Sequence, residues 1–173
     1  EKQASLTIEY QKTSKIPLMV SMDAEWGLGM RLKNKGLSFP HQLMLGAIQD
    51  YKELEVMGYA IGKQLLAIGV NVSFSPVADI NINPLNPVIG DRSFGEDKVE
   101  VSRRSIAYMR GLTAAGVLAC GKHFPGHGDT DIDSHFDLPV INYPMARLKE
   151  TELYPFQQLI EAGLPSMMVA HLH

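Results

Sequence analysis

The sequence of 173 residues lacks several features that would mark a specialised class of protein. It holds a single cysteine, Cys120, which excludes an internal disulfide, and the apolar run VLAC around it predicts a buried structural thiol. No run approaches the roughly 20 apolar residues that a membrane span needs. The formal net charge is only −3, without the basic excess typical of proteins that bind nucleic acid or anionic membranes. We therefore expect a globular domain with no membrane segment and no nucleic-acid partner.

The first residues, EKQASLTIEYQKT, lack an initial methionine and the apolar core of a signal peptide. We expect the chain to start within a longer protein, with the first strand of its fold before Glu1. An export signal could precede that point, so cytoplasmic, periplasmic and exported locations all remain open. No GxGxxG motif follows the first apolar run, which counts against a dinucleotide-binding fold. No cofactor is expected.

Short apolar runs alternate with segments of helical periodicity along the whole chain. The runs predict strands at 16–22, 70–80, 117–124 and 165–171, and apolar spacing predicts helices at 43–68, 98–115 and 145–162. Each helix is long enough for a crossover and no hairpin turn joins two strands. This order predicts an α/β fold with a parallel sheet, either doubly wound or a (β/α)8 barrel.

Polar side chains recur where the predicted strands end. Asp23, Asp79, His171 and the pair Lys122 and His123 occupy such positions, and in a barrel these ends carry the active site. A complete barrel needs about 250 residues, whereas four strands are predicted here. We therefore expect residues 1–173 to form a single partial domain, about half of a (β/α)8 TIM barrel.

The stretch GKHFPGHGDTDIDSH, residues 121–135, gathers three histidines and three aspartates. Its DTDID segment resembles the start of a calcium loop, but Ser134 replaces the required glycine and Val140 the required acid. HEXXH and cysteine pairs are absent, so a zinc site is not favoured either. No GK[ST] follows the glycines, which counts against a phosphate-binding loop. No metal site is predicted.

A proton-transfer pair is a further interpretation of the same stretch. Asp133 and His135 are separated by one residue, so on an extended segment their side chains point the same way. A carboxylate beside an imidazole fixes its tautomer and stabilises its protonated form. Such a pair could donate a proton to a leaving group and later accept one from water. A solvated loop with accidental histidines remains equally open from the residues alone.

KHFPGHGDTDIDSH resembles the signature of family 3 glycoside hydrolases of the β-N-acetylglucosaminidase type. PLMVSMDAEWG, VSFSPVADIN, NPVIGDRSFG and SMMVAH resemble further motifs of that family, in the same order. The resemblance spans residues 16–171 and implies a (β/α)8 barrel that hydrolyses terminal β-linked N-acetylglucosamine with retention. The saccharides would be of the cell-wall or chitin type.

The resemblance also implies roles for individual residues. His135 would be the general acid/base and Asp133 its orienting partner. Five residues would bind the sugar: Asp23, Arg92, Lys122, His123 and His171. Without the family match, Arg92 could simply pair with Asp91 or Glu96. Glu25 and Asp79 are interpreted as loop-closing acceptors, and Trp26 either stacks on a sugar or packs on the barrel rim.

The family's nucleophile is an aspartate several strands later, and this chain ends before it. We therefore expect the 173-residue chain alone to be inactive, and the rest of the barrel or a second chain to be needed to close its sheet. A β-glucosidase or a glycoside phosphorylase of the same family is an alternative. A non-catalytic sugar-binding half-barrel and a metal-dependent hydrolase are alternatives from other classes.

Overall fold

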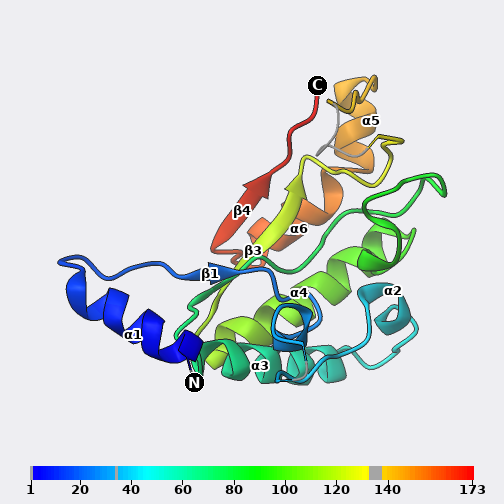
Figure 1. The fold of residues 1–173 in the computed structure, drawn as a ribbon. Helices are drawn as coiled ribbons and strands as arrows, with labels where there is room; N and C mark the ends of the chain where they lie inside the picture. The colour runs from blue at the N-terminus through cyan, green and yellow to red at the C-terminus, as the bar shows by residue number, and fades with distance from the viewer. Residues whose placement is uncertain (1, 34, 133–137) are drawn as a thin grey trace.

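The computed structural model describes residues 2–33, 35–132 and 138–173. Helices and short strands alternate along the chain (Figure 1). The strands are β1 (Ser21–Met22), β2 (Val72–Ser73), β3 (Leu118–Phe124) and β4 (Ser166–Val169). The helices are α1 (Lys2–Thr13), α2 (Gln42–Leu45), α3 (Tyr51–Leu66), α4 (Lys98–Ala115), α5 (Met145–Glu150) and α6 (Tyr154–Glu161), with 3-10 turns η1 (Leu28–Met30) and η2 (Gly90–Arg92).

The four strands form one parallel sheet in the order β1-β2-β3-β4. Each strand is joined to the next by helical segments, and α3, α4 and α6 pack together along the sheet (Figure 1). Sequential parallel strands with intervening helices are the repeating unit of the (β/α)8 barrel. The prediction of an α/β fold made of about half a barrel is confirmed.

The second predicted strand, 70–80, pairs over a much shorter length than expected. Its ladder covers Val72–Ser73, and Val77 forms an isolated bridge to Lys122. Pro76 lies between these two stretches and has no N–H to donate to a ladder. Beyond it the Gln42 side chain takes the place of a neighbouring strand, donating to Val77 O at 2.9 Å and accepting from Val77 N at 3.2 Å.

The helix predicted over 43–68 is two helices in the structure, α2 and α3. The break occurs at Gly46, where any side chain would collide with the carbonyl oxygen of Phe94. Helix α3 then begins after Asp50, whose carboxylate accepts a hydrogen bond from Lys52 N at 2.9 Å and so caps the new helix. A contact with a distant part of the chain thus sets this boundary.

The helix predicted over 145–162 is also divided, into α5 and α6. Between them lies Glu152, which is buried and accepts two hydrogen bonds of 2.7 Å from Arg147. The N-terminal residues, for which no element was predicted, form α1. Its Thr7 packs against Gly69, at the turn that leads into β2. The prediction of a buried Cys120 is confirmed, since only 5% of the residue is exposed.

The main core lies between the sheet and the helices α3, α4 and α6. Helices α3 and α4 cross at glycines, Gly58 and Gly111, which bring the two backbones together. A Cβ atom at Gly111 would overlap the carbonyl oxygen of Glu55, and one at Gly58 would overlap that of Tyr108. In the packed helix α4, Tyr108 contacts the segment that follows β1.

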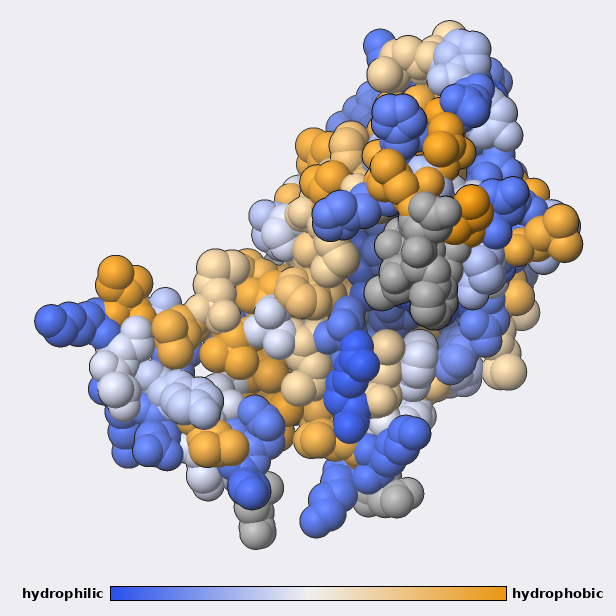
Figure 2. All heavy atoms as spheres, turned by 45° about the horizontal axis from the view of Figure 1, so that its top comes forward, coloured by the Kyte–Doolittle hydropathy of each residue, from blue (hydrophilic) through white to orange (hydrophobic). Residues whose placement is uncertain are grey.

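The described sheet has two edge strands, β1 and β4, each with one strand neighbour. Apolar side chains near these edges are exposed, including Ile16 (77%), Met19 (70%) and Val169 (68%). Figure 2 shows exposed apolar groups, in orange, among hydrophilic ones on one face of the molecule. Among the described residues, no helix combines the length and the apolar character that crossing a membrane requires.

Candidate active site

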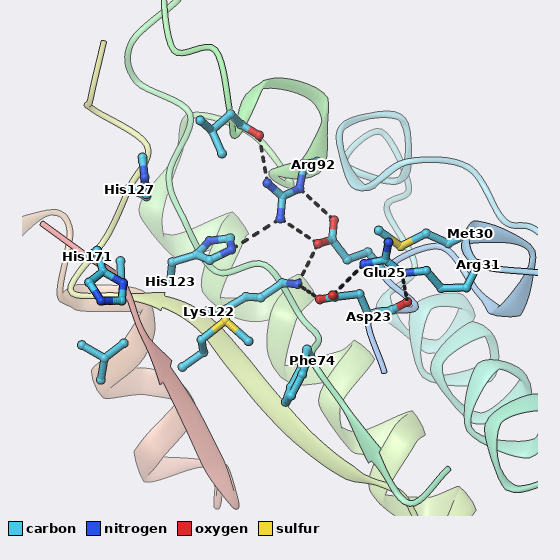
Figure 3. Close-up of a pocket in the computed structure, with 14 residues that line it drawn as sticks. Asp23, Glu25, Met30, Arg31, Phe74, Arg92, Lys122, His123, His127 and His171 are labelled. Carbon is cyan, nitrogen blue, oxygen red and sulfur yellow. Dashed lines mark hydrogen bonds and ion pairs between the residues drawn. The ribbon is translucent and has the colours of Figure 1, made fainter. Parts of the chain in front are cut away.

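The carboxyl ends of the strands meet at one pocket of about 400 Å³ (Figure 3). Asp23 follows β1, Lys122 and His123 lie at the end of β3, and His171 follows β4. Arg92 reaches the same pocket from η2, in the loop after β2. The structure therefore brings together all five residues predicted to bind a sugar. Their role in binding remains a prediction.

Lys122 is the central cation of this pocket. Its side chain is only 2% exposed, and its Nζ lies 2.8 Å from Asp23 Oδ1 and 2.8 Å from Glu25 Oε1. A buried ammonium group is costly unless it is paired and hydrogen-bonded. Asp23 and Glu25 supply that pairing from the segment that follows β1. One lysine thus joins the ends of two strands that are 99 residues apart in sequence.

Arg92 is held by a buried carboxylate. Its Nε and Nη2 donate to the two oxygens of Glu25 at 3.0 and 2.7 Å, a bidentate arrangement, and its Nη1 donates to Val88 O at 3.0 Å. The alternative prediction, pairing of Arg92 with Asp91 or Glu96, is wrong. Asp91 instead lies 2.7 Å from His41 Nδ1. Arg92 pairs with Glu25 because a buried carboxylate left unpaired costs more free energy than an exposed one.

Ion pairing also shifts the titration of these groups. Burial alone would raise the pKa of Glu25, but hydrogen bonding to Arg92 and attraction to Lys122 outweigh it and lower that pKa. Burial opposes the same shift at Asp23, where Lys122 and Arg31 lower the pKa. The pKa of Arg92 is raised by Glu25 against the effect of burial. All three groups therefore stay charged at neutral pH.

His123 lies between the cations and a further carboxylate. Its Nδ1 is 2.7 Å from Asp79 Oδ2, and its Nε2 is 3.4 Å from Arg92 Nη2 (Figure 3). Asp79 is fully buried. Burial would raise its pKa, but the His123 ring and the backbone N–H groups of His127 and His123 lower it. The interpretation of Asp79 as a mere loop-closing acceptor is therefore incomplete, since it also contacts a pocket side chain.

The sequence reasoning missed Arg31. This residue follows η1 in the loop that folds back over β1, and its Nη2 donates to Asp23 Oδ2 at 2.6 Å. No local pattern marks it, because only the return of the loop brings it to the pocket. Glu25 did carry a signal: it is two residues from Asp23, the same spacing that suggested a pair at 133 and 135. Trp26 stacks on His41, with ring centroids 4.1 Å apart.

Tyr108 supports the segment after β1 from below. Its side chain is fully buried, and its hydroxyl donates to Glu25 O at 3.0 Å and lies 3.3 Å from Ala24 O. Burial raises the pKa of this phenol well above its usual value, so it remains a neutral donor. The backbone that presents Glu25 to Arg92 and Lys122 is thereby tied to helix α4.

Asp133 and His135, the predicted acid/base pair, lie outside the described residues. The segment that leads to them is held to the loop carrying Arg92 through Asn86. The Asn86 Nδ2 donates to His127 O at 2.7 Å and to Thr130 O at 2.8 Å. Asn86 Oδ1 accepts from Ile89 N at 2.7 Å, just before η2. One amide thus fixes the start of the 126–132 segment relative to the pocket.

These features are those of an α/β-barrel domain with a small polar binding site at the carboxyl ends of its strands. Carboxylates and cations alternate in the site. Their hydrogen-bond donors and acceptors face one pocket and are of the kinds that bind hydroxyl groups. The model of the glycosyl hydrolase family 3 N-terminal domain matches residues 2–173. The chain belongs to that family.

Individual relatives agree with this assignment. The chain is 39% identical to a β-hexosaminidase of Thiobacillus denitrificans over 175 residues, covering 98% of this chain and 48% of that protein. The structure of a family 3 β-N-acetylglucosaminidase from Paenibacillus sp. strain FPU-7 matches with a TM-score of 0.94 and 41% identity, over 99% of this chain and 33% of that one.

A β-glucoside phosphorylase structure also matches, with a TM-score of 0.89 and 32% identity, over 96% of this chain and 30% of that one. The chain spans 28% of the length of a β-hexosaminidase A of Pseudoalteromonas piscicida and 50% of that of a β-hexosaminidase of Nitrosomonas eutropha. The predicted family and the predicted barrel fold are confirmed by these comparisons.

Proposed function

We propose that the full-length protein containing this chain removes terminal β-linked N-acetylglucosamine from cell-wall or chitin-type saccharides, with retention. One observation carries the proposal. The five residues implied by the family resemblance converge on a single pocket, in a domain 41% identical to a β-N-acetylglucosaminidase. The substrate class is carbohydrate, and no cofactor takes part in the scheme.

The pocket suits a sugar because it offers both kinds of hydrogen-bonding group. Asp23, whose side chain is 33% exposed, can accept from two adjacent hydroxyls. Lys122 and Arg92 are held by carboxylates and keep N–H groups that can donate to hydroxyl oxygens. His171 would close the side formed by β4. Fixed donors and acceptors of this kind recognise a hydroxyl pattern without rearranging.

The proposed chemistry uses two further residues and a carboxylate that this chain does not supply. His135, oriented by Asp133, gives its proton to the glycosidic oxygen as the bond from that oxygen to the anomeric carbon breaks. A nucleophilic aspartate beyond residue 173 forms a bond to the same carbon. His135 then takes a proton from water, whose oxygen displaces the aspartate and restores the original configuration.

The same proposal treats residues 1–173 as one partial domain of the family 3 barrel. Its described sheet ends at β1 and β4, with exposed apolar side chains beside both. We propose that the remainder of the barrel, or a second chain, pairs with these edges and covers those side chains. Closure would also bring the missing nucleophile to the pocket.

Hydrolysis of a chromogenic β-N-acetylglucosaminide by the full-length protein tests this function. We expect turnover to exceed that of the matching β-glucoside, and the first product to be the β-anomer by NMR. Asp133→Asn should lower kcat by about 100-fold or more while binding of N-acetylglucosamine is kept. Asp131→Asn, an exposed change in the same segment, is the matched control. Equal loss in both variants, or no hydrolysis by the wild type, would contradict the proposal.

A phosphorylase is the second candidate, and the match to a β-glucoside phosphorylase favours it. A histidine acid/base leaves room for a phosphate anion as the acceptor, whereas a second carboxylate base would repel it. Adding inorganic phosphate to the same assay separates the two functions. A hydrolase releases free sugar at an unchanged rate, and a phosphorylase releases the sugar 1-phosphate.

A further inference from the structure

The Asp79 carboxylate connects three donors on the segment that follows β3. Its Oδ2 accepts from His123 Nδ1 at 2.7 Å, and its Oδ1 accepts from His127 N at 2.7 Å. The backbone N–H of His123 lies 3.1 and 3.2 Å from the two oxygens. Asp79 itself is fixed by Ser93, whose hydroxyl donates to Asp79 O at 2.6 Å. Because Asp79 has no solvent-exposed surface, protein groups take the place of water around its carboxylate.

These contacts determine which ring nitrogen of His123 carries the proton. An ionised carboxylate only accepts hydrogen bonds, so the Nδ1 facing Asp79 must be the N–H. A guanidinium only donates, so the Nε2, 3.4 Å from Arg92 Nη2, must be the acceptor. The two neighbours therefore select the same neutral form from opposite sides of the ring.

We propose that Asp79 is a positioning residue that holds His123 as its Nδ1–H tautomer, so that Nε2 can exchange its long 3.4 Å contact with Arg92 for a hydrogen bond from a hydroxyl of the bound sugar. This inference rests on the proposed function only for the identity of the ligand. Arg92, whose Nη2 lies 3.4 Å from His123 Nε2, can only donate, and so can Lys122 in the same pocket (Figure 3). With an acceptor beside these donors, a single sugar hydroxyl can donate a hydrogen bond to His123 and accept one from a cation.

Replacement of Asp79 by asparagine separates this role from simple packing, because the two side chains have nearly the same shape. One oxygen of the Asp79 carboxylate accepts a hydrogen bond from His127 N, and the other accepts one from His123 Nδ1. An amide has a single oxygen, and if that oxygen keeps the His127 N–H, its NH₂ group faces Nδ1. The ring must then accept at Nδ1 and carry its proton on Nε2, against the donor of Arg92.

A second aspartate–histidine pair provides the matched control. Asp91 Oδ2 lies 2.7 Å from His41 Nδ1, the same separation as at Asp79, but the side chains of His41 and Asp91 are 40% and 63% exposed and neither lines the pocket. Asp91→Asn therefore breaks a pair of equal length outside the site. Among the histidine ring signals in ¹H–¹⁵N NMR, this variant should alter only those of His41, and it should leave the KM unchanged.

The test is two-bond ¹H–¹⁵N NMR of the full-length protein labelled with ¹⁵N-histidine, with His123 assigned from His123→Gln. The expected wild-type spectrum at neutral pH shows His123 protonated at Nδ1 and bare at Nε2. Asp79→Asn should move the proton to Nε2 and raise the KM for an N-acetylglucosaminide by about 10- to 100-fold. Circular dichroism of each variant confirms that it is folded.

A wild-type His123 that carries its proton on Nε2 overturns the proposal, even if Asp79→Asn does not fold. An unchanged His123 tautomer in folded Asp79→Asn also overturns it. Because the spectra require no substrate, they decide the tautomer independently of which sugar the enzyme hydrolyses. A failure of the proposed function would appear in the hydrolysis assay alone.

Discussion

Replacing Lys122 with methionine removes the ammonium group that joins Asp23 to Glu25 but keeps most of the buried stem. Two charge-assisted hydrogen bonds of 2.8 Å are lost. Each such bond contributes about 1.5–3 kcal/mol. Asp23 is one-third exposed and keeps Arg31, and Glu25 keeps Arg92, so the sum must be reduced. We expect a loss of about 2–4 kcal/mol in the free energy of unfolding, close to that for breaking a buried ion pair.

The pH dependence of this loss follows from Glu25. Its pKa in the folded protein lies below the reference value of 4.5, against burial, because of Arg92 and Lys122. A lowered pKa stabilises the folded state above the unfolded pKa, and this stability is lost as pH falls through the folded pKa. Removing Lys122 takes away one of the two cations that oppose burial, so the pKa of Glu25 is higher in the variant than in the wild type. Acid unfolding of the variant should therefore begin at a higher pH.

Thermal unfolding of the full-length protein from pH 8 down to about pH 2 measures both effects, because the folded-state pKa of Glu25 lies below 4.5. A loss of 2–4 kcal/mol corresponds to a Tm lower by about 4–16 °C for a domain of 150–250 residues, and by less for a larger one. Lys52→Met is the control, because Lys52 pairs with Glu55 on the exposed surface of α3 and should contribute little. A Lys122→Met variant with the Tm and acid midpoint of the wild type would refute the reasoning.

Three further predictions concern other parts of the chain. The 173-residue chain alone should not hydrolyse a chromogenic N-acetylglucosaminide, and robust turnover by it would show that no external nucleophile is needed. Gly111→Ala should destabilise the protein by about 1–3 kcal/mol in urea unfolding, since its Cβ overlaps Glu55 O, and an unchanged midpoint would contradict the close crossing. Asn86→Ala removes the donor to the carbonyls of His127 and Thr130 and the acceptor for Ile89 N, so kcat should fall about 10-fold or more in steady-state assays. A kcat equal to that of the wild type would show that Asn86 does not position this segment.

The ends of the strands could be predicted from sequence because two simple patterns coincide there. A short apolar run indicates a buried parallel strand, and the polar residue after it falls at the carboxyl edge of the sheet. Asp23, Lys122, His123 and His171 were all placed correctly by this argument. Arg92 joined them through the family resemblance, since no strand precedes it directly.

The partners of these residues could not be predicted in the same way. Arg92 has two acidic residues near it in sequence, yet it binds Glu25, 67 residues earlier. That choice depends on which carboxylate is buried, and burial is a property of the folded chain. The break at Gly46 has the same origin, because the carbonyl that excludes a side chain there belongs to Phe94. Local patterns predict elements, whereas contacts across the barrel set their limits and pairings.

The alternation of charges in the pocket has a consequence for the forces that act on a ligand. Asp23, Glu25 and Asp79 are each matched by a nearby cation or by N–H donors. The strong local fields of these groups cancel within a few ångströms, so little field extends into the solvent. An approaching molecule is neither steered nor repelled by its charge, and added salt has little to screen. Recognition is then left to short-range hydrogen bonds, which suits a ligand that is uncharged but covered with hydroxyl groups.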